Sequence, residues 1–539
     1  MNSTHSSAAR DFNLDLQADV LVIGGGPAGT WAAWSAASEA ANVILVDKGY
    51  CGTTGATAAA GTGIWYVAPD PDARKAAMAS REALGGYLAH RDWMMRVLDR
   101  TYANVNSLAE WGYPFPLDDT GQPQRNSLQG PDYMRLMRQK IKRAGVTVLD
   151  HSPALELLVD HEGAVGGAIG IQRQTGERWR IRSNAVVIAT GGCAFLSKAL
   201  GCNVLTGDGY LMAAEAGADF SGMEFSNAYG ISPAFATVTK TLFYNWASFT
   251  YEDGTVIPGA GSQKGRSVIA QTLLTQPVYA ILDKATEDMR SIMRNAQPNF
   301  FLPFDRMGID PFTQRFPVTL RLEGTVRGTG GIRIVDQSCA TVVPGLYAAG
   351  DAATRELICG GFTGGGSHNA AWATSSGYWS GQAAAIYARR SGEQAIQRQV
   401  EPAGTLPPER KQTLDPKAVV AAVQAEVFPY DRNYFRNQSS LTASLERLDS
   451  LWQTIRETGM ATTVQAREAA AMVATARWMY RSAIERRESR GMHKHTDYPQ
   501  LDPAQQHHLV SGGLDQVWVQ SQPLSDQVVA VKVAVGAGQ

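Results

Sequence analysis

The sequence has few cysteines, and none of them stands beside another at the spacing of a metal site. Iron–sulfur clusters and structural zinc sites are typically held by C-x-x-C pairs. No two of the five cysteines form such a pair. We therefore expect no metal site in this chain. An odd, scattered set also argues against a disulfide framework and indicates a reducing compartment. The five are Cys51, Cys193, Cys202, Cys339 and Cys359.

Long apolar runs and an excess of either charge are missing too. No uninterrupted apolar stretch approaches the roughly 20 residues of a membrane-spanning helix, and residues 1–18 contain no apolar core of a secretory signal. Lysine and arginine total 49 against 50 acidic residues, so the formal net charge is −1. That balance argues against nucleic-acid binding. We expect no nucleic-acid partner, no direct membrane insertion and a cytoplasmic location.

Glycine is abundant, and its clearest cluster follows a predicted strand. The apolar run Ala18–Ile23 leads into the sequence GGGPAG at residues 24–29, and an alanine-rich segment typical of a helix follows. Such glycines permit a tight turn and close approach of the backbone to a pyrophosphate, and the helix N-terminus favours the anion. Asp47 ends the next strand, about 20 residues further on, where a carboxylate can reach ribose hydroxyls. Together these features predict a dinucleotide site; the plainer interpretation is a glycine-rich turn.

Two later segments have the same character. Ala185–Gly192 (AVVIATGG) and Pro344–Asp351 (PGLYAAGD) are each an apolar strand that ends in small residues. Ligands of parallel sheets lie beyond the carboxyl ends of the strands. Each segment alone could be a buried strand followed by a turn, but in this order after the first cluster they predict one composite cofactor site.

The order of these three segments resembles the FAD-binding domain of the fumarate reductase/succinate dehydrogenase flavoprotein superfamily, over roughly residues 18–500. A looser similarity to the adenylylsulfate reductase alpha subunit lies in residues 350–377 and 490–499. The resemblance implies that FAD is the cofactor. Further matching motifs are Thr206–Gly209 (TGDG), Met223–Phe225 (MEF), Gly330–Ile332 (GGI), Arg487–Gly491 (RESRG) and Asp497–Pro499 (DYP).

The expected fold class is α/β. We expect a discontinuous Rossmann-like FAD-binding domain (residues 18–219 and 334–402) and an inserted α+β capping domain (220–333). A helical C-terminal domain (418–500) and a β-like tail (501–539) complete the chain.

The C-terminal third has its own signals. Residues 403–417 are rich in proline and charge and are typical of a linker. Leu441, Leu445 and Leu448 keep helical spacing, and the tail contains β-like stretches such as Val528–Val535.

The resemblance also implies which residues contact the cofactor, and that FAD is not covalently bound. Many members attach FAD through the histidine of an S-H-T sequence, whereas the matching run here is Gly55-Ala56-Thr57. Alanine offers no nucleophilic nitrogen. The residues expected at FAD are Gly24, Gly26, Pro27, Ala28, Gly29, Asp47, Lys48, Thr53, Thr54, Gly55, Thr57, Gly61, Thr190, Gly191, Asp208, Gly350, Asp351, Ser375 and Ser376.

Three departures from the family pattern bear on the substrate. No histidine follows Met223–Phe225, where dicarboxylate enzymes have H-P-T, and none occurs in residues 323–329, where they have H-Y-T-M before G-G-I. Their R-D-V-V-x-R-A motif matches residues 266–272 here and places Gln271 at the arginine. Glutamine provides neither the proton nor the charged clamp of an arginine. We therefore expect no action on succinate or fumarate.

Four residues are candidates for the active site. Arg327 could bind an anionic substrate or stabilise charge on a reduced flavin. Glu323 lies four residues earlier and is expected to approach the flavin with it, although Glu323 and a nearby arginine could equally form a structural ion pair. His368 lies in a glycine-rich loop beside the third cofactor segment. Tyr229, with Asn227, replaces the substrate-side segment of the family and could instead pack the cap.

The expected function is an FAD-dependent oxidoreductase that exchanges a hydride with an unidentified organic substrate. We expect it to act as a flavoprotein subunit that exchanges electrons with a separate, ferredoxin-like iron–sulfur protein. One alternative is a self-contained flavin oxidase or ene-reductase. The other is an electron-relay flavoprotein without a substrate of its own.

Overall fold

A computed structural model describes residues 12–117, 120–239, 241–262, 264–364, 366–392, 396–404, 406, 414–459 and 463–524. The β-like stretch expected at Val528–Val535 and most of the expected linker lie outside these residues.

An eight-stranded sheet forms the centre of the molecule, in the order β16-β6-β7-β8-β1-β2-β5, with β15 also paired to β8. Strands β8, β1, β2, β5 and β15 pair in parallel, and the remaining pairs are antiparallel. Strands β2 and β15 and the last four residues of β1 and of β8 are apolar and buried, because both faces of the sheet are covered there. The bounds are β1 Leu14–Ile23, β2 Val43–Val46, β5 Thr147–Leu149, β6 Ala154–Val159, β7 Val165–Ile171, β8 Arg178–Ile188, β15 Leu346–Ala348 and β16 Glu401–Pro402.

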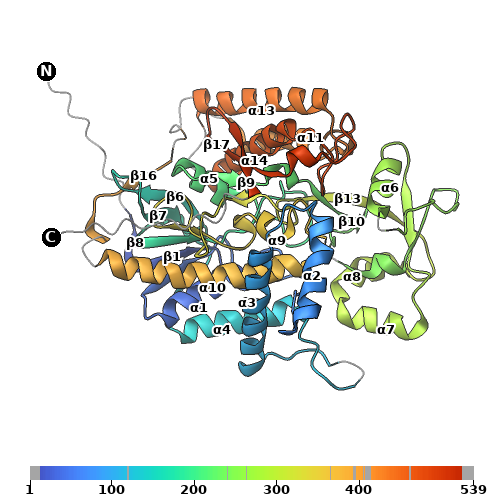
Figure 1. The fold of residues 1–539 in the computed structure, drawn as a ribbon, viewed down its shortest axis with the longest axis horizontal. Coiled ribbons are helices and arrows are strands. Elements are labelled where there is room, and N and C mark those ends of the chain that lie inside the picture. Colours follow the sequence, from blue (N-terminus) through green and yellow to red (C-terminus); the bar gives the residue numbers. More distant parts are fainter. Residues whose placement is uncertain are drawn as a thin grey trace.

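Small residues bring two helices together on one face of this sheet. Helix α1 (Pro27–Ser38) and the long helix α10 (Gly366–Ser391) run together below the sheet in Figure 1. A Cβ atom at Gly377 would lie 2.3 Å from the carbonyl oxygen of Ala28, so the contact requires glycine. Helices α2 (Pro71–Leu84), α3 (Arg91–Glu110) and α4 (Gly130–Arg143) complete this face, and the pair β3 (Gly61–Gly63) and β4 (Ser127–Gln129) lies beside it.

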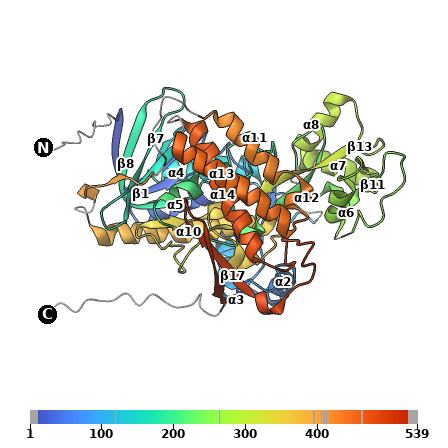
Figure 2. The same ribbon diagram turned by 90° about the horizontal axis from the view of Figure 1, so that it is seen from above.

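The capping segment has a sheet of its own, in the order β10-β13-β12-β11. Its apolar core contains interlocking phenylalanines, among them Phe243, Phe300 and Phe304. This unit projects from the rest of the chain on the right of Figures 1 and 2. The bounds are β10 Ala228–Pro233, β11 Ser248–Thr250, α6 Gly265–Thr272, β12 Val278–Ile281, α7 Glu287–Ala296, α8 Pro298–Met307 and β13 Phe316–Gly324.

C-terminal helices cover the opposite face, as Figure 1 shows above the sheet. The tail does not stand alone: β17 (His507–Gly512) and β18 (Trp518–Pro523) form a hairpin whose β17 pairs with β9 (Phe220–Ser221), which in turn pairs with β14 (Gly331–Ile332). Among the described residues, no helix is both long and apolar enough to cross a membrane. The remaining helices are α5 Asp208–Glu215, α9 Glu356–Cys359, α11 Pro416–Val427, α12 Tyr430–Asn433, α13 Gln438–Thr458 and α14 Val464–Glu485.

Candidate functional site

The glycine cluster adopts the tight strand-to-helix turn that its sequence predicts. Gly24 has a φ of +109°, which favours glycine, and an added Cβ would lie 2.3 Å from the carbonyl oxygen of Ala189. A Cβ at Gly29 would lie 1.8 Å from the carbonyl oxygen of Gly24. Gly26 differs, because a Cβ there would meet no atom within 4 Å. Gly24 and Gly29 therefore build the turn, and Gly26 leaves its outer side open.

Asp47 holds this turn from the end of β2. Its Oδ2 accepts a 2.6 Å hydrogen bond from the backbone N–H of Gly25, while its Oδ1 accepts from the N–H of Gly49 at 2.7 Å and from Oγ1 of Thr54 at 2.9 Å. A carboxylate has about four acceptor positions. Asp47 therefore stabilises two loops and keeps acceptor capacity for a hydroxyl.

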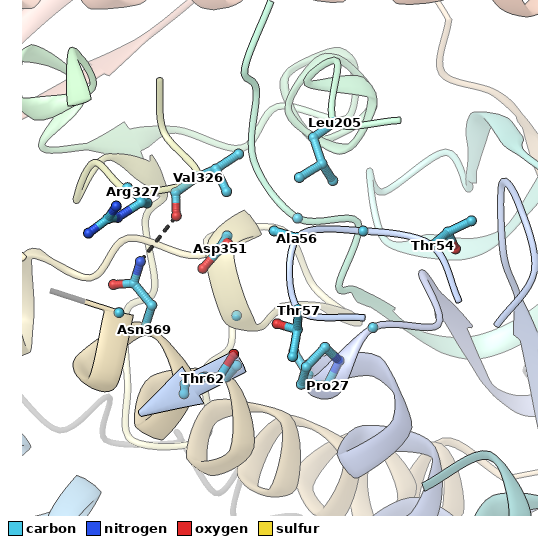
Figure 3. Close-up of a pocket in the computed structure, with 18 of the residues that line it drawn as sticks. Pro27, Thr54, Ala56, Thr57, Thr62, Leu205, Val326, Arg327, Asp351 and Asn369 are labelled. Atoms are coloured by element: carbon cyan, nitrogen blue, oxygen red, sulfur yellow. Dashed lines mark hydrogen bonds between the residues drawn. The ribbon is translucent and has the colours of Figure 1, made fainter. Parts of the chain in front are cut away.

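A cavity of about 1010 Å³ opens in front of the turn. Figure 3 shows Pro27 and Thr57 on one side of it and Val326 and Arg327 on the other, with Asp351 between them. The expected cofactor residues that line it are Gly24, Gly26, Pro27, Ala28, Asp47, Lys48, Thr54, Gly55, Thr57, Gly61, Thr190, Gly191, Asp208, Gly350 and Asp351. The three sequence segments thus meet at one site.

Three other charged residues that line the cavity, Lys48, Asp208 and Asp351, are held in ion pairs. Lys48 Nζ lies 2.6 Å from both Asp208 Oδ2 and Glu468 Oε1. Burial alone would lower the pKa of Lys48, but these two carboxylates raise it. Asp351 Oδ1 lies 2.6 Å from Nη1 of Arg355, whose side chain is fully buried. These pairs fix the charges around the cavity.

Four of the expected cofactor residues stand behind the cavity wall. Gly29 allows α1 to approach the turn. Ser376 Oγ accepts a 2.9 Å hydrogen bond from the N–H of Gly350 and so supports that loop. Ser375 is buried against Thr101, and the Thr53 hydroxyl donates to the carbonyl of Tyr50. All four were expected to contact the cofactor directly. In the structure, these residues take part in helix packing and local turns behind the wall.

The cap-side end of the cavity is lined by residues of both the cap and the central domain. Arg327 lines the cavity and donates from Nη1 to Oε2 of Glu323 at 3.2 Å. Glu323 is fully buried and also accepts a 2.8 Å hydrogen bond from Thr239 Oγ1. Two of the four candidate residues are therefore brought together, with Arg327 at the surface of the cavity and Glu323 behind it.

Arg266 is the residue at this end that the sequence interpretation missed. It is the second residue of α6 and lines the cavity, whereas Gln271 near the end of the same helix is exposed. The expectation that Gln271 marks the loss of an active-site arginine is therefore not supported, because Arg266 provides a guanidinium there. Burial lowers the pKa of Arg266, and the nearby positive charge of Arg327 lowers it further. In the sequence, the R-x-V motif at residues 266–268 was the feature that could have identified Arg266 as a candidate for the site.

His368 lies beside the cavity without lining it. Its ring packs 4.6 Å from that of Trp65, centroid to centroid, and its Nε2 is buried with no hydrogen-bond partner. Burial lowers its pKa to about 3, with the charge of Arg81 acting in the same direction. In this position the imidazole packs behind Trp65, and a contact of His368 with flavin or substrate stays a prediction.

Tyr229 and Asn227 turn away from the cavity. The Tyr229 hydroxyl donates to the carbonyl of Val427 at 2.8 Å, and Asn227 Nδ2 donates to the carbonyl of Asn433 at 2.7 Å. Both side chains are buried against the C-terminal helices. These hydrogen bonds favour the alternative that both residues pack the cap against α11 and α12. Their positions depend on a tertiary contact across about 200 residues, which local sequence does not reveal.

Other cavity residues had no individual motif. Asn369 donates to the carbonyl of Val326 at 3.1 Å and ties α10 to the Arg327 segment, as the dashed line in Figure 3 marks. Further wall residues, both apolar and polar, come from the loops beside β3 and β4, from the cap and from the start of α10. These further residues are Ile64, Trp65, Tyr66, Asn126, Thr241, Leu242, Phe243, Asn245, Ala296, Gln297 and Ser367.

The arrangement fits a dinucleotide with a flat ring system. The open side at Gly26 and Gly55, where an added Cβ would meet nothing within 4 Å, leaves room for phosphates close to the backbone. The remaining acceptor capacity of Asp47 suits a ribose hydroxyl. In the described residues, no group of three histidine, cysteine or acidic side chains is placed to hold a metal.

Comparisons with known proteins agree with this fit. Residues 19–228 match the FAD binding domain family, and residues 427–534 match the family described as fumarate reductase flavoprotein C-term. One subunit of the fumarate reductase (CoM/CoB) of Methanothermobacter marburgensis is 24% identical over 90% of this chain and 95% of its own length.

Solved structures share the fold. A variant of the E. coli quinol fumarate reductase superimposes with a TM-score of 0.80 at 20% identity, over 96% of this chain and 98% of the other. Adenylylsulfate reductase from Archaeoglobus fulgidus gives a TM-score of 0.75 at 18% identity, over 94% and 96%. The expected resemblance to both is confirmed at the level of the fold. With its dinucleotide turn, composite cavity and two matching family models, the chain is similar over most of its length to the FAD-binding flavoproteins of the fumarate reductase/succinate dehydrogenase superfamily.

Proposed function

We propose that this flavoprotein transfers a hydride between noncovalently bound FAD and a small organic substrate held at the cap-side end of the cavity. FAD supplies the hydride chemistry when it is bound. The observation that supports the proposal is that one continuous cavity is lined by the dinucleotide turn and by cap residues such as Arg266 and Phe243. A molecule held by the cap would therefore share its chamber with the cofactor.

Arg327 and Glu323 are proposed to handle charge at this end. Glu323 is anchored by Thr239 on one side and orients the Arg327 guanidinium on the other. A fixed positive charge at the cavity surface stabilises negative charge that develops during hydride transfer, and does so strongly because the site is partly buried. Arg327 is therefore the proposed catalytic residue, and Glu323 positions it.

Succinate and fumarate are proposed not to be the substrates. No histidine lines the cavity in the part of the chain that the structure describes, whereas the dicarboxylate motifs place two there. The arginine expected to be missing is provided by Arg266, so the proposal rests on the histidines alone. A fumarate assay must accompany any substrate screen, since the Methanothermobacter relative is named a fumarate reductase.

Electrons are proposed to pass to or from a separate iron–sulfur protein in the cytoplasm. The five cysteines of this chain are free and buried at separate places in the fold, as they would be in a chain that carries no cluster of its own. The Methanothermobacter relative is itself named as one subunit of its enzyme.

Anaerobic turnover with artificial electron carriers tests the proposed reaction. Reduced methyl viologen would be supplied with unsaturated organic acids, including fumarate, and an oxidised dye with the saturated acids. We expect turnover with at least one organic acid and slow reoxidation of the reduced flavin by air. Fast reoxidation with stoichiometric hydrogen peroxide would favour the self-contained oxidase. Flavin that cycles with carriers but with no organic acid would favour the electron relay and contradict the proposal.

A further inference from the structure

Arg355 is a fully buried arginine that joins two loops beside the cavity. Its Nη1 lies 2.6 Å from Oδ1 of Asp351, which lines the cavity. Its Nε donates to the carbonyl oxygen of Gly328 at 3.1 Å, and its Nη2 donates to the carbonyl oxygens of Thr325 and Gly328. One guanidinium thus holds the loop of residues 325–328 against the loop that carries Asp351.

The loop of residues 325–328 carries Arg327, the proposed catalytic residue, and lies between strands β13 and β14. Side chains from residues 355–369 donate to all four of its carbonyl groups. The Thr363 hydroxyl donates to the carbonyl of Arg327 at 3.0 Å, and Asn369 Nδ2 donates to that of Val326 at 3.1 Å. Arg355 binds the other two. The backbone around Arg327 is therefore held by three side chains rather than by a helix or a strand.

An arginine suits this arrangement better than a lysine does. A guanidinium has five N–H donors in a rigid plane, whereas an ammonium group has three donors at a single point. Arg355 directs Nε, Nη1 and Nη2 at a carboxylate and two carbonyl oxygens. A lysine in its place would keep the positive charge beside Asp351 and lose most of the contacts to the loop.

We propose that Arg355 is a positioning residue for hydride transfer. By holding the 325–328 loop against the Asp351 loop, it sets where the Arg327 guanidinium stands relative to the cofactor. Arg355 itself is not among the residues that line the cavity, so it acts through Arg327. The inference rests on the proposed function, because it assumes that Arg327 stabilises charge in the reaction.

A double-mutant cycle between Arg355 and Arg327 tests the proposal. Arg355→Lys is expected to lower kcat by about tenfold or more, since a small displacement of a catalytic group is costly. The second background combines Arg327→Gln with Glu323→Gln, so that no carboxylate loses its partner. There Arg355→Lys should change kcat by less than about twofold, because the guanidinium that it positions is gone. Equal losses in both backgrounds, or no loss in either, would overturn the proposal.

The midpoint potential of the bound flavin gives a readout that needs no organic acid. Displacing Arg327 moves a positive charge away from the reduced flavin, so Arg355→Lys should lower the potential of the otherwise unchanged protein. In the background without the Arg327 guanidinium, it should leave the potential unchanged. A potential that shifts equally in both backgrounds, or in neither, would contradict the proposal. If no organic acid is turned over, the proposed function fails and this comparison still decides the role of Arg355.

Two further variants separate positioning from folding. Arg333→Lys is the matched control, because Arg333 pairs with Asp219 at 2.8 Å instead, and it should keep both kcat and potential. Thr363→Val keeps the shape of a buried side chain and removes only the hydroxyl that holds the Arg327 carbonyl. We expect a loss of about fivefold in kcat that disappears without the Arg327 guanidinium. This variant tests the same loop if Arg355→Lys fails to fold, and an equal loss in both backgrounds would again overturn the proposal.

Discussion

The Glu224 carboxylate accepts a 2.7 Å hydrogen bond from Nε of Arg486, and both side chains are fully buried between the Met223–Phe225 turn and the end of α14. Glu356, also buried, lies close enough to add its negative charge. Burial raises the pKa of Glu224 to about 7, although Arg486 opposes the shift, and burial likewise raises that of Glu356 to about 7. Three buried arginines, Arg436, Arg486 and Arg490, share this junction with the carboxylates, so burial is the main cause of the two raised pKa values.

The raised pKa of Glu356 predicts a pH-dependent stability that Glu356→Gln removes in part. A carboxyl whose folded pKa lies above its unfolded value of 4.5 stabilises the protein fully at low pH, and the contribution is lost as pH rises through about 7. The variant should therefore gain stability relative to wild type between pH 4.5 and 7, on the order of 3 kcal/mol, and remain constant above. Urea unfolding at several pH values measures the difference.

Other titratable groups near Glu356 also change stability with pH, so the experiment needs a control. The pKa of His508, whose Nδ1 lies 3.8 Å from Glu356, is lowered to about 4 by burial, so its own contribution has the opposite pH dependence. Only the difference between variant and wild type isolates Glu356. Glu162→Gln, at an exposed glutamate, should give a pH-independent difference near zero. A Glu356→Gln curve parallel to wild type from pH 4.5 to 8 would contradict the prediction.

The two outer glycines of the turn should respond differently to alanine. Gly26→Ala places its Cβ in the open cavity at a φ of −76°, so we expect a normally folded apoprotein with at least tenfold weaker FAD binding. Gly29→Ala drives its Cβ to 1.8 Å from the Gly24 carbonyl and should destabilise the fold itself by about 1–3 kcal/mol or more. Thermal unfolding of both apoproteins, followed by FAD titration, separates the effects. Equal FAD affinity in Gly26→Ala and wild type would exclude the assigned role.

The strands around the dinucleotide turn could be predicted from the sequence, because each is a short apolar run followed directly by glycines or other small residues. The runs beginning at Ala18, Asn42, Ala185 and Gly345 all lie in or at the start of strands β1, β2, β8 and β15. Their pairing follows from the parallel βα arrangement. The glycine-rich strand β7 (VGGAIGI) escaped notice, since glycine disfavours strands and hides the alternation of side chains.

The residues at the cap-side end of the cavity could not be identified from the sequence in the same way. Tyr229 lies next to residues of the family motif, yet its hydroxyl binds the carbonyl of Val427, a contact decided by how the C-terminal helices pack. Arg266 faces the cavity and Gln271 faces solvent because α6 turns one side toward the central domain. A motif alignment gives the positions of such residues but not the direction in which a helix face points.

Loss of the attachment histidine predicts that FAD can be removed without breaking a bond. Ala56 lines the cavity in Figure 3, and its methyl group cannot form a link to the flavin. Acid precipitation of the purified holoprotein should release all of the flavin to the supernatant, and a denaturing gel should show no flavin fluorescence at the protein band. Flavin retained in the pellet would reveal a covalent link at another residue.

The ion pair between Arg327 and Glu323 permits a test of whether Arg327 acts in catalysis or only in folding. Arg327→Gln removes the partner of a carboxylate that is 1% exposed, so stability should fall by about 3–5 kcal/mol. Adding Glu323→Gln removes that uncompensated charge and keeps a hydrogen-bonding group for Thr239. The double variant should therefore recover most of the lost thermal stability.

Activity should not recover with stability. If the Arg327 guanidinium stabilises charge in the transition state, both Arg327→Gln and the double variant should lose on the order of 100-fold or more in kcat. Glu323→Gln alone keeps the guanidinium at the cavity and should lose less. A structural role predicts the reverse, namely that the double variant regains kcat together with its melting temperature. Comparing kcat and melting temperature across the four proteins of this cycle separates the two roles, because only catalysis requires the charge itself.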